Sequence, residues 1–231
     1  MIVMANRTPM PPNTQPEAPE PAPITLRARY VFPGGPLEEV RRLRRDVHFQ
    51  SRGHRPNFAR RITDPLDVSG TTLVLETYSQ PVAAVRLHDF VPPAVRTQYG
   101  RLFDIDRFAA DCPLRALATA SRFVVRAEHR HRTAFDRMMT EAYVYWQLRK
   151  IRLSLVACTP SLHPLFERYG FREYLPPTSL PGGTPVLRMA LVMEDAAGLS
   201  ASGSLLQHLV RRPELGAEAR AWMVRNFPLF N

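Results

Sequence analysis

The sequence predicts a mixed α/β fold in which one β-sheet carries helices on both faces. Residues Leu117–Val125 are an apolar run of strand length that leads into a long helical pattern over Thr133–Ile151. Arg152–Cys158 is another apolar run, typical of a strand covered on both sides. Ile24–Phe32 alternates between apolar and polar residues, with Val31 as the exception, which favours a half-buried strand. Strands and helices alternating in this way indicate a mixed sheet flanked by helices.

The chain of 231 residues, 45% of them hydrophobic, is long enough to bury one proper core. Residues 1–23 hold seven prolines without apolar periodicity, so we expect a disordered leader there. Residues 24–195 are the predicted globular domain. Residues 196–231 are expected to form a helical extension packed on that domain.

In the first half of the domain, Leu37–Phe49 has apolar residues at helical spacing and predicts an amphipathic helix. Residues 50–67 lack periodicity and predict a long loop, either a functional lid or a floppy surface insertion. Thr71–Tyr78 and Pro81–His88 predict two adjacent strands joined by turn residues. A short helix is expected near Ala94–Phe103.

The second half begins with the strand Leu117–Val125 and the helix Thr133–Ile151, whose apolar stripe indicates core packing. A strand over Arg152–Cys158 follows. Ser161–Tyr169 predicts a short helix that ends at Gly170. The remaining predictions are strands at Phe171–Tyr174 and Val186–Met193, a loop from 176 to 185 between them, and helices at Leu205–Val210 and Ala217–Val224.

The basic turn between the strand Leu117–Val125 and the following helix is a candidate anion site. It holds His129, Arg130, His131 and Arg132. Backbone N–H groups at a helix start lack partners inside the helix, and the helix dipole favours negative charge there. A phosphate-bearing ligand fits this turn, and a solvated basic loop is the alternative.

A formal net charge of +10, with Lys150 as the only lysine, indicates an acidic partner. Nucleic acid, an anionic membrane surface, an acidic carrier protein and a phosphorylated cofactor all qualify. The arginines are not interleaved with aromatic residues and no nucleic-acid-binding motif is present, so nucleic acid is the least favoured. Peripheral membrane contact stays open.

The two cysteines, Cys112 and Cys158, are too few and too far apart for a disulfide framework or a zinc site, and we predict no metal. This composition fits a reducing cytoplasm. No apolar run approaches the length of a membrane-spanning helix, and the N-terminus carries no recognisable signal.

Four short motifs, in order, resemble one family of acyltransferases. They are Arg44 with Val47 and His48; Asp64 and Asp67; Val85, Arg86 and Leu87 at the end of a strand; and Ser121, Arg122 and Phe123 on the central strand. Together with the segment Phe166–Phe171, they resemble the GNAT acyltransferase fold over residues 24–193. Within it, the chain is similar to acyl-homoserine lactone synthases and long-chain N-acyl amino acid synthases.

The resemblance implies a substrate pocket for an amino acid or its sulfonium derivative. An ammonium group needs acids, which Asp64 and Asp67 can supply, and a carboxylate needs an arginine fork, which Arg44, Arg86 and Arg122 can supply. The alternative is a set of internal ion pairs that tie the long loop to the sheet, with the two aspartates as turn and cap residues.

The resemblance also implies that the acyl donor lies along the central strand. Backbone groups near Phe123 and Val125 would pair with the pantetheine amides, and the turn formed by Arg130, Arg132, Thr133 and Ala134 would receive the phosphate. The expected donor is an acyl thioester on the 4′-phosphopantetheine of an acyl carrier protein, or acyl-CoA, with no tightly bound cofactor.

The chain departs from the family pattern at three places. Thr119 stands where the synthases carry a glutamate and cannot act as a base at neutral pH. Phe166 stands where acetyltransferases often have a tyrosine. The phosphate turn contains no glycine, which argues against tight CoA binding and favours an acyl carrier protein meeting Arg126, Arg130, Arg132 and Arg137. Glu76, Asp104 and Asp106 are candidate replacement bases, and the sequence does not decide among them.

The predicted function is therefore transfer of an acyl group, expected to be long, from an acyl carrier protein thioester to the amine of an amino acid. A catalytically inactive relative that binds acyl chains or an acyl carrier protein is the first alternative. Lactone synthesis is a further alternative, made less favoured by Thr119 and by the Pro-rich loop before Val186.

Overall fold

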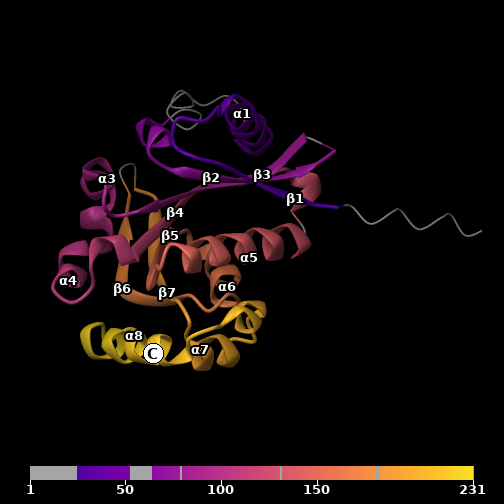
Figure 1. Cartoon of the computed structure of the whole chain (residues 1–231). Helices are drawn as coiled ribbons and strands as arrows, with labels where there is room; N and C mark the ends of the chain where they lie inside the picture. The colour runs from indigo at the N-terminus through magenta and orange to yellow at the C-terminus, as the bar shows by residue number, and fades with distance from the viewer. Residues whose placement is uncertain (1–24, 53–63, 79, 131, 181–182, 231) are drawn as a thin grey trace, which may run out of the picture.

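A seven-stranded mixed sheet forms the centre of the structure, a computed structural model that describes residues 25–52, 64–78, 80–130, 132–180 and 183–230 (Figure 1). The predicted leader and most of the loop 50–67 lie outside these residues. The strand order is β1-β2-β3-β4-β5-β7-β6. The strands are β1 (Arg27–Val31), β2 (Thr71–Thr77), β3 (Gln80–Asp89), β4 (Leu117–Val125), β5 (Leu153–Cys158), β6 (Arg172–Ser179) and β7 (Pro185–Val192).

All neighbouring strands pair antiparallel except β4 and β5, which are parallel. The long helix α5 (Arg132–Leu148) connects these two strands, as a parallel crossover requires. The predicted strand over Leu117–Val125 is confirmed with the same bounds. Its position beside β5 places the parallel pair in the middle of the sheet.

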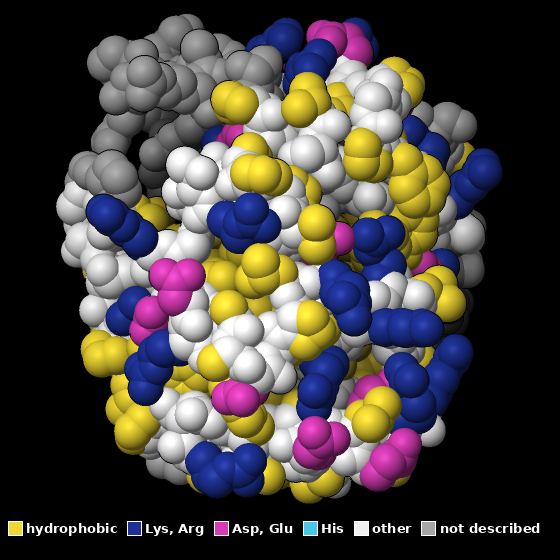
Figure 2. Space-filling model, turned by 60° about the vertical axis from the view of Figure 1, so that its left-hand side comes forward, with side chains coloured by type: hydrophobic (Ala, Val, Ile, Leu, Met, Phe, Trp, Pro, Cys, Tyr) yellow, Lys and Arg dark blue, Asp and Glu magenta, His cyan; other side chains and the backbone are white. Residues whose placement is uncertain are grey.

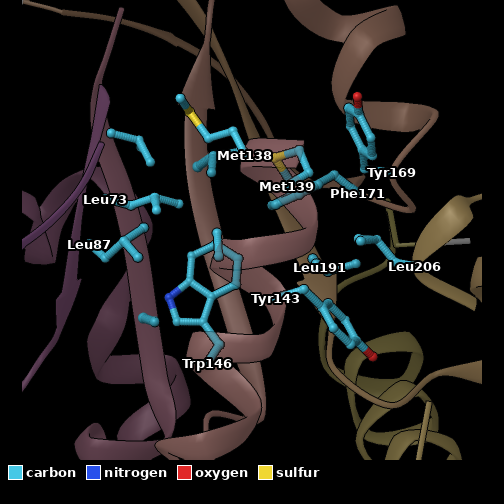
Figure 3. Packing of buried hydrophobic residues seen from close by; sticks show 14 of the residues in the cluster. Leu73, Leu87, Met138, Met139, Tyr143, Trp146, Tyr169, Phe171, Leu191 and Leu206 are labelled. Carbon is cyan, nitrogen blue, oxygen red and sulfur yellow. The ribbon is translucent and has the colours of Figure 1, made fainter. Parts of the chain in front are cut away.

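Helices cover both faces of the sheet. The helix α1 (Glu38–Arg52) packs its apolar stripe, including Val40 and Leu43, on one face. The helix α5 packs Met138, Tyr143 and Trp146 on the other face, and Figure 3 shows these side chains at close range. Figure 1 shows α1 and α5 on opposite sides of β2 and β3, as the predicted fold class requires.

The remaining helices cover the part of the sheet beyond β4. Aromatic residues of α3 (Pro93–Phe103) and α4 (Ile105–Ala109) pack with α8 (Pro213–Asn226) on the face opposite α5. On the α5 face lie α6 (His163–Glu167), α7 (Ala196–Ala201) and the 3-10 helix Leu205–Leu209. Residues beyond 195 thus contribute to the core on both faces.

The structure differs from the sequence predictions at three places. The predicted loop 176–185 begins later, because β6 continues through Pro176 and Pro177 to Ser179. These prolines are tolerated since β6 is an edge strand and its register with β7 shifts there. The helices α4 and α7 were not predicted, because each is too short to show apolar periodicity. Val31 is buried against α1, so both faces of β1 are in use.

The exit from α6 follows the prediction. Gly170 has φ +94°, which favours glycine, and an added Cβ would approach the Leu199 side chain to 2.6 Å. A 3-10 helix over Pro160–Leu162 precedes α6. Every helix within the described ranges is too short or too polar to span a bilayer.

Candidate active site

The site lies where β4 and β5 separate. The two strands pair only through Leu117–Thr119 and Leu153–Leu155. On its other edge, β4 shifts register against β3 between Ala84 and Arg86, and Arg122 adopts a left-handed conformation with φ +55°. Such a bulge bends the strand and increases its twist. The part of β4 beyond Thr119 therefore borders an opening in the sheet.

An apolar cavity of about 490 Å³ lies on the α5 side of this opening. Its volume is in the range of small-molecule sites. Most of its wall is aliphatic, aromatic or sulfur-containing, so it suits a hydrocarbon chain. We call it the acyl cavity; its lining includes Val85, Leu87, Phe123, Val125, Phe135, Met138, Met139, Ala142, Trp146, Val156, Cys158, Leu162, Leu165, Phe166 and Phe171.

A second cavity of about 630 Å³ lies between α3, β4 and β6. We call it the arginine cavity, because Arg101, Arg122 and Arg188 line it and no lining residue that the structure describes is a carboxylate or an imidazole. Figure 2 views the molecule from the side of α3 and β6, where Lys and Arg side chains lie among hydrophobic ones. The cavity is suited to an anion.

The two cavities meet at the opening between β4 and β5. Ala120, Ser121 and Arg122 of β4 and Ala157 of β5 line both of them. A molecule in the acyl cavity and one in the arginine cavity would therefore come together at these four residues. The arrangement supports reaction between a hydrophobic and an anionic substrate.

Beneath the opening, three predicted arginines and two predicted aspartates form one ion-pair network. Arg44 Nη1 donates to Asp67 Oδ2 at 2.7 Å. Arg86 Nη1 donates to Asp67 Oδ1 at 2.9 Å and lies 3.1 Å from Asp64 Oδ1. Arg122 donates from Nε to Asp64 Oδ2 at 3.0 Å and also bonds it through Nη2. Arg44 and Arg86 are fully buried, whereas 27% of the Arg122 side chain is exposed.

Asp64 also starts the 3-10 helix Pro65–Val68, because its Oδ1 accepts from the Leu66 amide at 2.9 Å. Burial acts to raise the pKa of the Asp64 carboxyl. Hydrogen bonds from Arg122, the Leu66 amide and Arg86 outweigh burial and hold that pKa well below its usual range. These contacts are the internal ion pairs of the second sequence alternative, and they join residues 64–68 to the sheet.

Arg86 connects this network to both cavities. Its Nε donates to Ser121 Oγ at 3.2 Å, and its Nη2 donates to the Tyr99 hydroxyl at 3.2 Å. Ser121 lines both cavities and Tyr99 lines the arginine cavity. Sequence reasoning gave neither residue a role. The contacts depend on pairing of Arg86 with Ser121 across β3 and β4, which the sequence does not display.

His88 is a buried neighbour of the network. Burial first and the Arg86 guanidinium second lower the pKa of His88 to about 4. Its Nε2 lies 3.0 Å from the Leu66 carbonyl oxygen. Gly70 permits this packing, since a Cβ there would come within 2.8 Å of both the His88 ring and the Arg86 side chain. His88 was also absent from the sequence predictions.

The three candidate bases lie apart from the cavities. Glu76 forms an ion pair with Arg29 at 2.7 Å. It lies near the end of β2, whereas Arg86 pairs with Thr72 at the opposite end of that strand. Asp104 ends α3 in a left-handed conformation, and Asp106 is on the surface of α4. Neither lines the acyl cavity or the arginine cavity. Thr119 is buried and lines the arginine cavity.

Three of the six predicted donor-binding residues line the acyl cavity. Phe123, Val125 and Arg130 line it, and Arg130 Nε donates to the Val125 carbonyl at 3.1 Å. Thr133 and Ala134 lie in the first turn of α5, where the N–H groups have no partner within the helix. Ala134 packs in the core and Thr133 is exposed. Arg132 begins α5, and its side chain is outside the described residues.

Solved structures of acyltransferases share this fold. FeeM, an N-acyl amino acid synthase from uncultured soil microbes, superposes with a TM-score of 0.58 at 14% identity, covering 80% of this chain and 99% of FeeM. BjaI, a CoA-dependent acyl-homoserine lactone synthase, gives 0.56 at 18% identity, covering 80% and 91%. The acyl-homoserine lactone synthase LasI gives 0.53 at 16% identity, covering 77% and 96%. At these identities the likeness establishes the GNAT fold.

No curated protein sequence is significantly similar to the chain. Residues 39–191, about two thirds of the chain, match the family described as N-acyl amino acid synthase FeeM. The matched region extends from α1 to β7 and so contains both cavities and the ion-pair network. The chain therefore belongs to the FeeM family of N-acyl amino acid synthases, which are acyltransferases.

Proposed function

We propose that the protein transfers a long-chain acyl group from the thioester of an acyl carrier protein to the amine of an amino acid. One observation carries this proposal: an apolar cavity and an arginine-lined cavity meet at the opening between β4 and β5. Acyl transfer to an amino acid needs one site for a hydrocarbon and one for a carboxylate, with the reacting groups between them.

The thioester carbonyl would lie at the opening, beside Ser121. Arg86 Nε donates to Ser121 Oγ, so the hydroxyl oxygen is used as an acceptor and its own hydrogen is directed elsewhere. We assign this O–H to the carbonyl oxygen of the donor, where negative charge develops in the tetrahedral intermediate. The buried guanidinium beside Ser121 favours that charge.

The acceptor carboxylate would bind in the arginine cavity beside Arg122. Arg44, Arg86 and Arg122 carry three positive charges, whereas Asp64 and Asp67 carry two negative charges. Among the described residues of this network the count leaves one excess positive charge, which favours an anion such as a carboxylate beside Arg122. Arg101 and Arg188 add two further guanidinium groups to the same cavity.

The reaction joins the amine nitrogen to the acyl carbon and breaks the bond from that carbon to sulfur. The amine must lose a proton before it attacks, and the nitrogen loses a second proton when the amide forms. The thiol leaves with one proton, so one proton passes to solvent. The two aspartates are held by arginines, and we therefore assign them to positioning Arg122 and Arg86, not to proton removal.

We favour acyl carrier protein over acyl-CoA as the donor. The phosphate turn before α5 contains no glycine, and the chain carries a formal charge of +10, which suits an acidic protein partner. The free thiols of Cys112 and Cys158 are buried and fit a reducing compartment, so we propose that the reaction takes place in the cytoplasm.

The proposal is tested by incubating the purified protein with a long-chain acyl carrier thioester, or the matching acyl-CoA, and a mixture of amino acids. The expected result is thiol release and an N-acyl amino acid by mass spectrometry, faster with the carrier protein. Ser121→Ala should lower kcat by about 100-fold. Ser154→Ala is the matched control, because Ser154 is buried on β5 and its hydroxyl has no partner among the described residues.

A catalytically inactive acyl-binding module is the second candidate. It is favoured by the absence of a carboxylate or imidazole among the described residues that line the two cavities. The same assay separates the two functions. Binding of the acyl carrier protein without thiol release or acylated product, under any acceptor or pH, would establish the binding module.

A further inference from the structure

One polar group in the wall of the acyl cavity has no partner. Trp146 of α5 lines this cavity and is 2% exposed. Its indole Nε1 is a buried donor without a hydrogen-bond partner in the described part of the chain. The other tryptophan, Trp222, donates its indole N–H to Asp111 Oδ2 at 2.9 Å. A buried N–H without an acceptor is unfavourable and rare, so Trp146 is unlike an ordinary packing residue.

The orientation of the indole places this donor between α5 and the sheet. Figure 3 shows the nitrogen-bearing edge of Trp146 turned toward the strands on the side of Leu87 and away from Tyr143. Leu87 and Trp146 are both lining residues of the acyl cavity. The N–H therefore lies on the side of α5 that the cavity occupies.

The other polar side chains of this wall lie at the opening or are already paired, and Arg122 is held by Asp64. Ser121 and Arg130 already hydrogen-bond to Arg86 and to the Val125 carbonyl. Cys158 lies 3.6 Å from the Met189 sulfur, and burial raises the pKa of its thiol to about 11. Around Trp146 the lining is apolar, with Leu87, Met138 and Ala142 among its members. An acceptor for the indole N–H would have to come from the ligand.

We propose that the acyl chain bound here carries an oxygen, as a hydroxyl or an oxo group, that accepts a hydrogen bond from Trp146 Nε1. This inference rests on the proposed function, because it takes the cavity as the acyl-donor site. Trp146 then determines specificity: an unsubstituted chain leaves the N–H unpaired, whereas an oxygenated chain pairs it. A site built to hydrogen-bond a substrate group discriminates against the analogue that lacks it.

The test uses acyl-pantetheine thioesters of equal chain length, unsubstituted or carrying a hydroxyl or oxo group at successive positions. Calorimetric titration should show about tenfold tighter binding of one oxygenated chain. Trp146→Phe should abolish that preference, so that the oxygenated and the unsubstituted chains bind the variant with equal affinity. Equal affinities in the parent protein, or a preference that survives Trp146→Phe, would overturn the inference.

A second variant separates loss of the N–H from the change in packing that the smaller phenylalanine ring causes. In a Trp222→Phe background, incorporation of benzothienylalanine for tryptophan at position 146 keeps the shape of the indole and removes only the N–H. The preference should again disappear. In the same background with Trp146 intact, indole fluorescence should change more with the oxygenated chain, whereas an identical change with both chains would contradict the assignment.

The two proposals fail in different ways. If the protein binds oxygenated thioesters more tightly than unsubstituted ones but forms no N-acyl product, the proposed enzymatic function is wrong and the Trp146 assignment stands. If N-acyl product forms at equal rates from both donors, the Trp146 assignment fails and the enzymatic function stands.

Discussion

Replacing Arg86 by methionine separates a structural arginine from a substrate-binding one. Arg86 is fully buried and holds both Asp64 and Asp67. Its removal leaves two buried carboxylates short of a partner, and breaking a buried pair in this way costs about 3–5 kcal/mol. Since a domain of this size has about 5–15 kcal/mol of stability, a large part of the unfolding free energy is lost. The melting temperature should fall by roughly 6–20 °C.

Arg122→Met is the contrasting variant. Arg122 contacts the same Asp64 but is partly exposed and lines both cavities. We expect a smaller loss of stability, about 1–2 kcal/mol, because solvent screens the exposed part of the guanidinium. The acceptor KM should rise by about 10- to 100-fold, since a charge-assisted hydrogen bond to the carboxylate is lost.

The assay combines urea unfolding with steady-state acyl transfer at varied acceptor concentration. Arg42→Met is the control, because Arg42 is exposed on α1, forms no ion pair with a described residue and should change neither quantity measurably. The reasoning would be refuted if Arg122→Met destabilised the fold as much as Arg86→Met while the acceptor KM stayed unchanged. It would also be refuted if Arg86→Met unfolded like the parent protein.

Three further predictions concern pH and packing. Burial and the Arg86 guanidinium lower the pKa of His88 to about 4. The unfolding free energy should therefore be constant above pH 6.5 and fall by about 3 kcal/mol between pH 6.5 and pH 4, because the unfolded chain binds the proton first. Urea unfolding at several pH values should show that His88→Gln loses this pH dependence. Gly216→Ala should lower the unfolding free energy by about 1–3 kcal/mol, because the added Cβ would overlap the Glu194 carbonyl. Gly100→Ala is its control and should not destabilise the protein, because no atom lies within 4 Å of the added Cβ. Below the pKa of the acceptor ammonium, kcat/KM should rise about tenfold per pH unit, because no described lining residue of either cavity is a carboxylate or an imidazole that could remove the proton. A kcat/KM that levels off at lower pH would show that the protein supplies a base.

Local patterns were sufficient for most elements of the fold. The run Leu117–Val125 gave the bounds of β4, because its two ends are apolar and buried, whereas the half-buried residues 120–123 border the opening. The helix predicted at Thr133–Ile151 differs from α5 by one residue at its start and three at its end. The helices that were missed are too short for a sequence pattern to reveal them. A helix as short as α7 shows no apolar period, although Asp195 caps it through the Gly198 amide.

The sequence indicated which charged residues belong to this cluster but not how they pair. Arginines and aspartates at Arg44, Asp64, Asp67, Arg86 and Arg122 suggested a site for an amino acid, and the structure brings all five together. Whether the acids bind a ligand or the arginines depends on distances between residues as far apart as 64 and 122. Those distances are set by the register of β3 with β4, which local sequence does not specify.

The same pairing constrains what the acceptor must bring to the reaction. Two buried carboxylates that already neutralise arginines are poor partners for an incoming ammonium, because each would have to give up a charge-assisted bond in a region that solvent barely reaches. The guanidinium groups of the arginine cavity add to the cost of bringing in a cation. An amino acid in its anionic, neutral-amine form carries a carboxylate for Arg122 and a nitrogen lone pair ready to attack. If the proposed function holds, the electrostatics of the site would therefore favour the reactive form of the acceptor, and a glutamate at the position of Thr119 would be less needed.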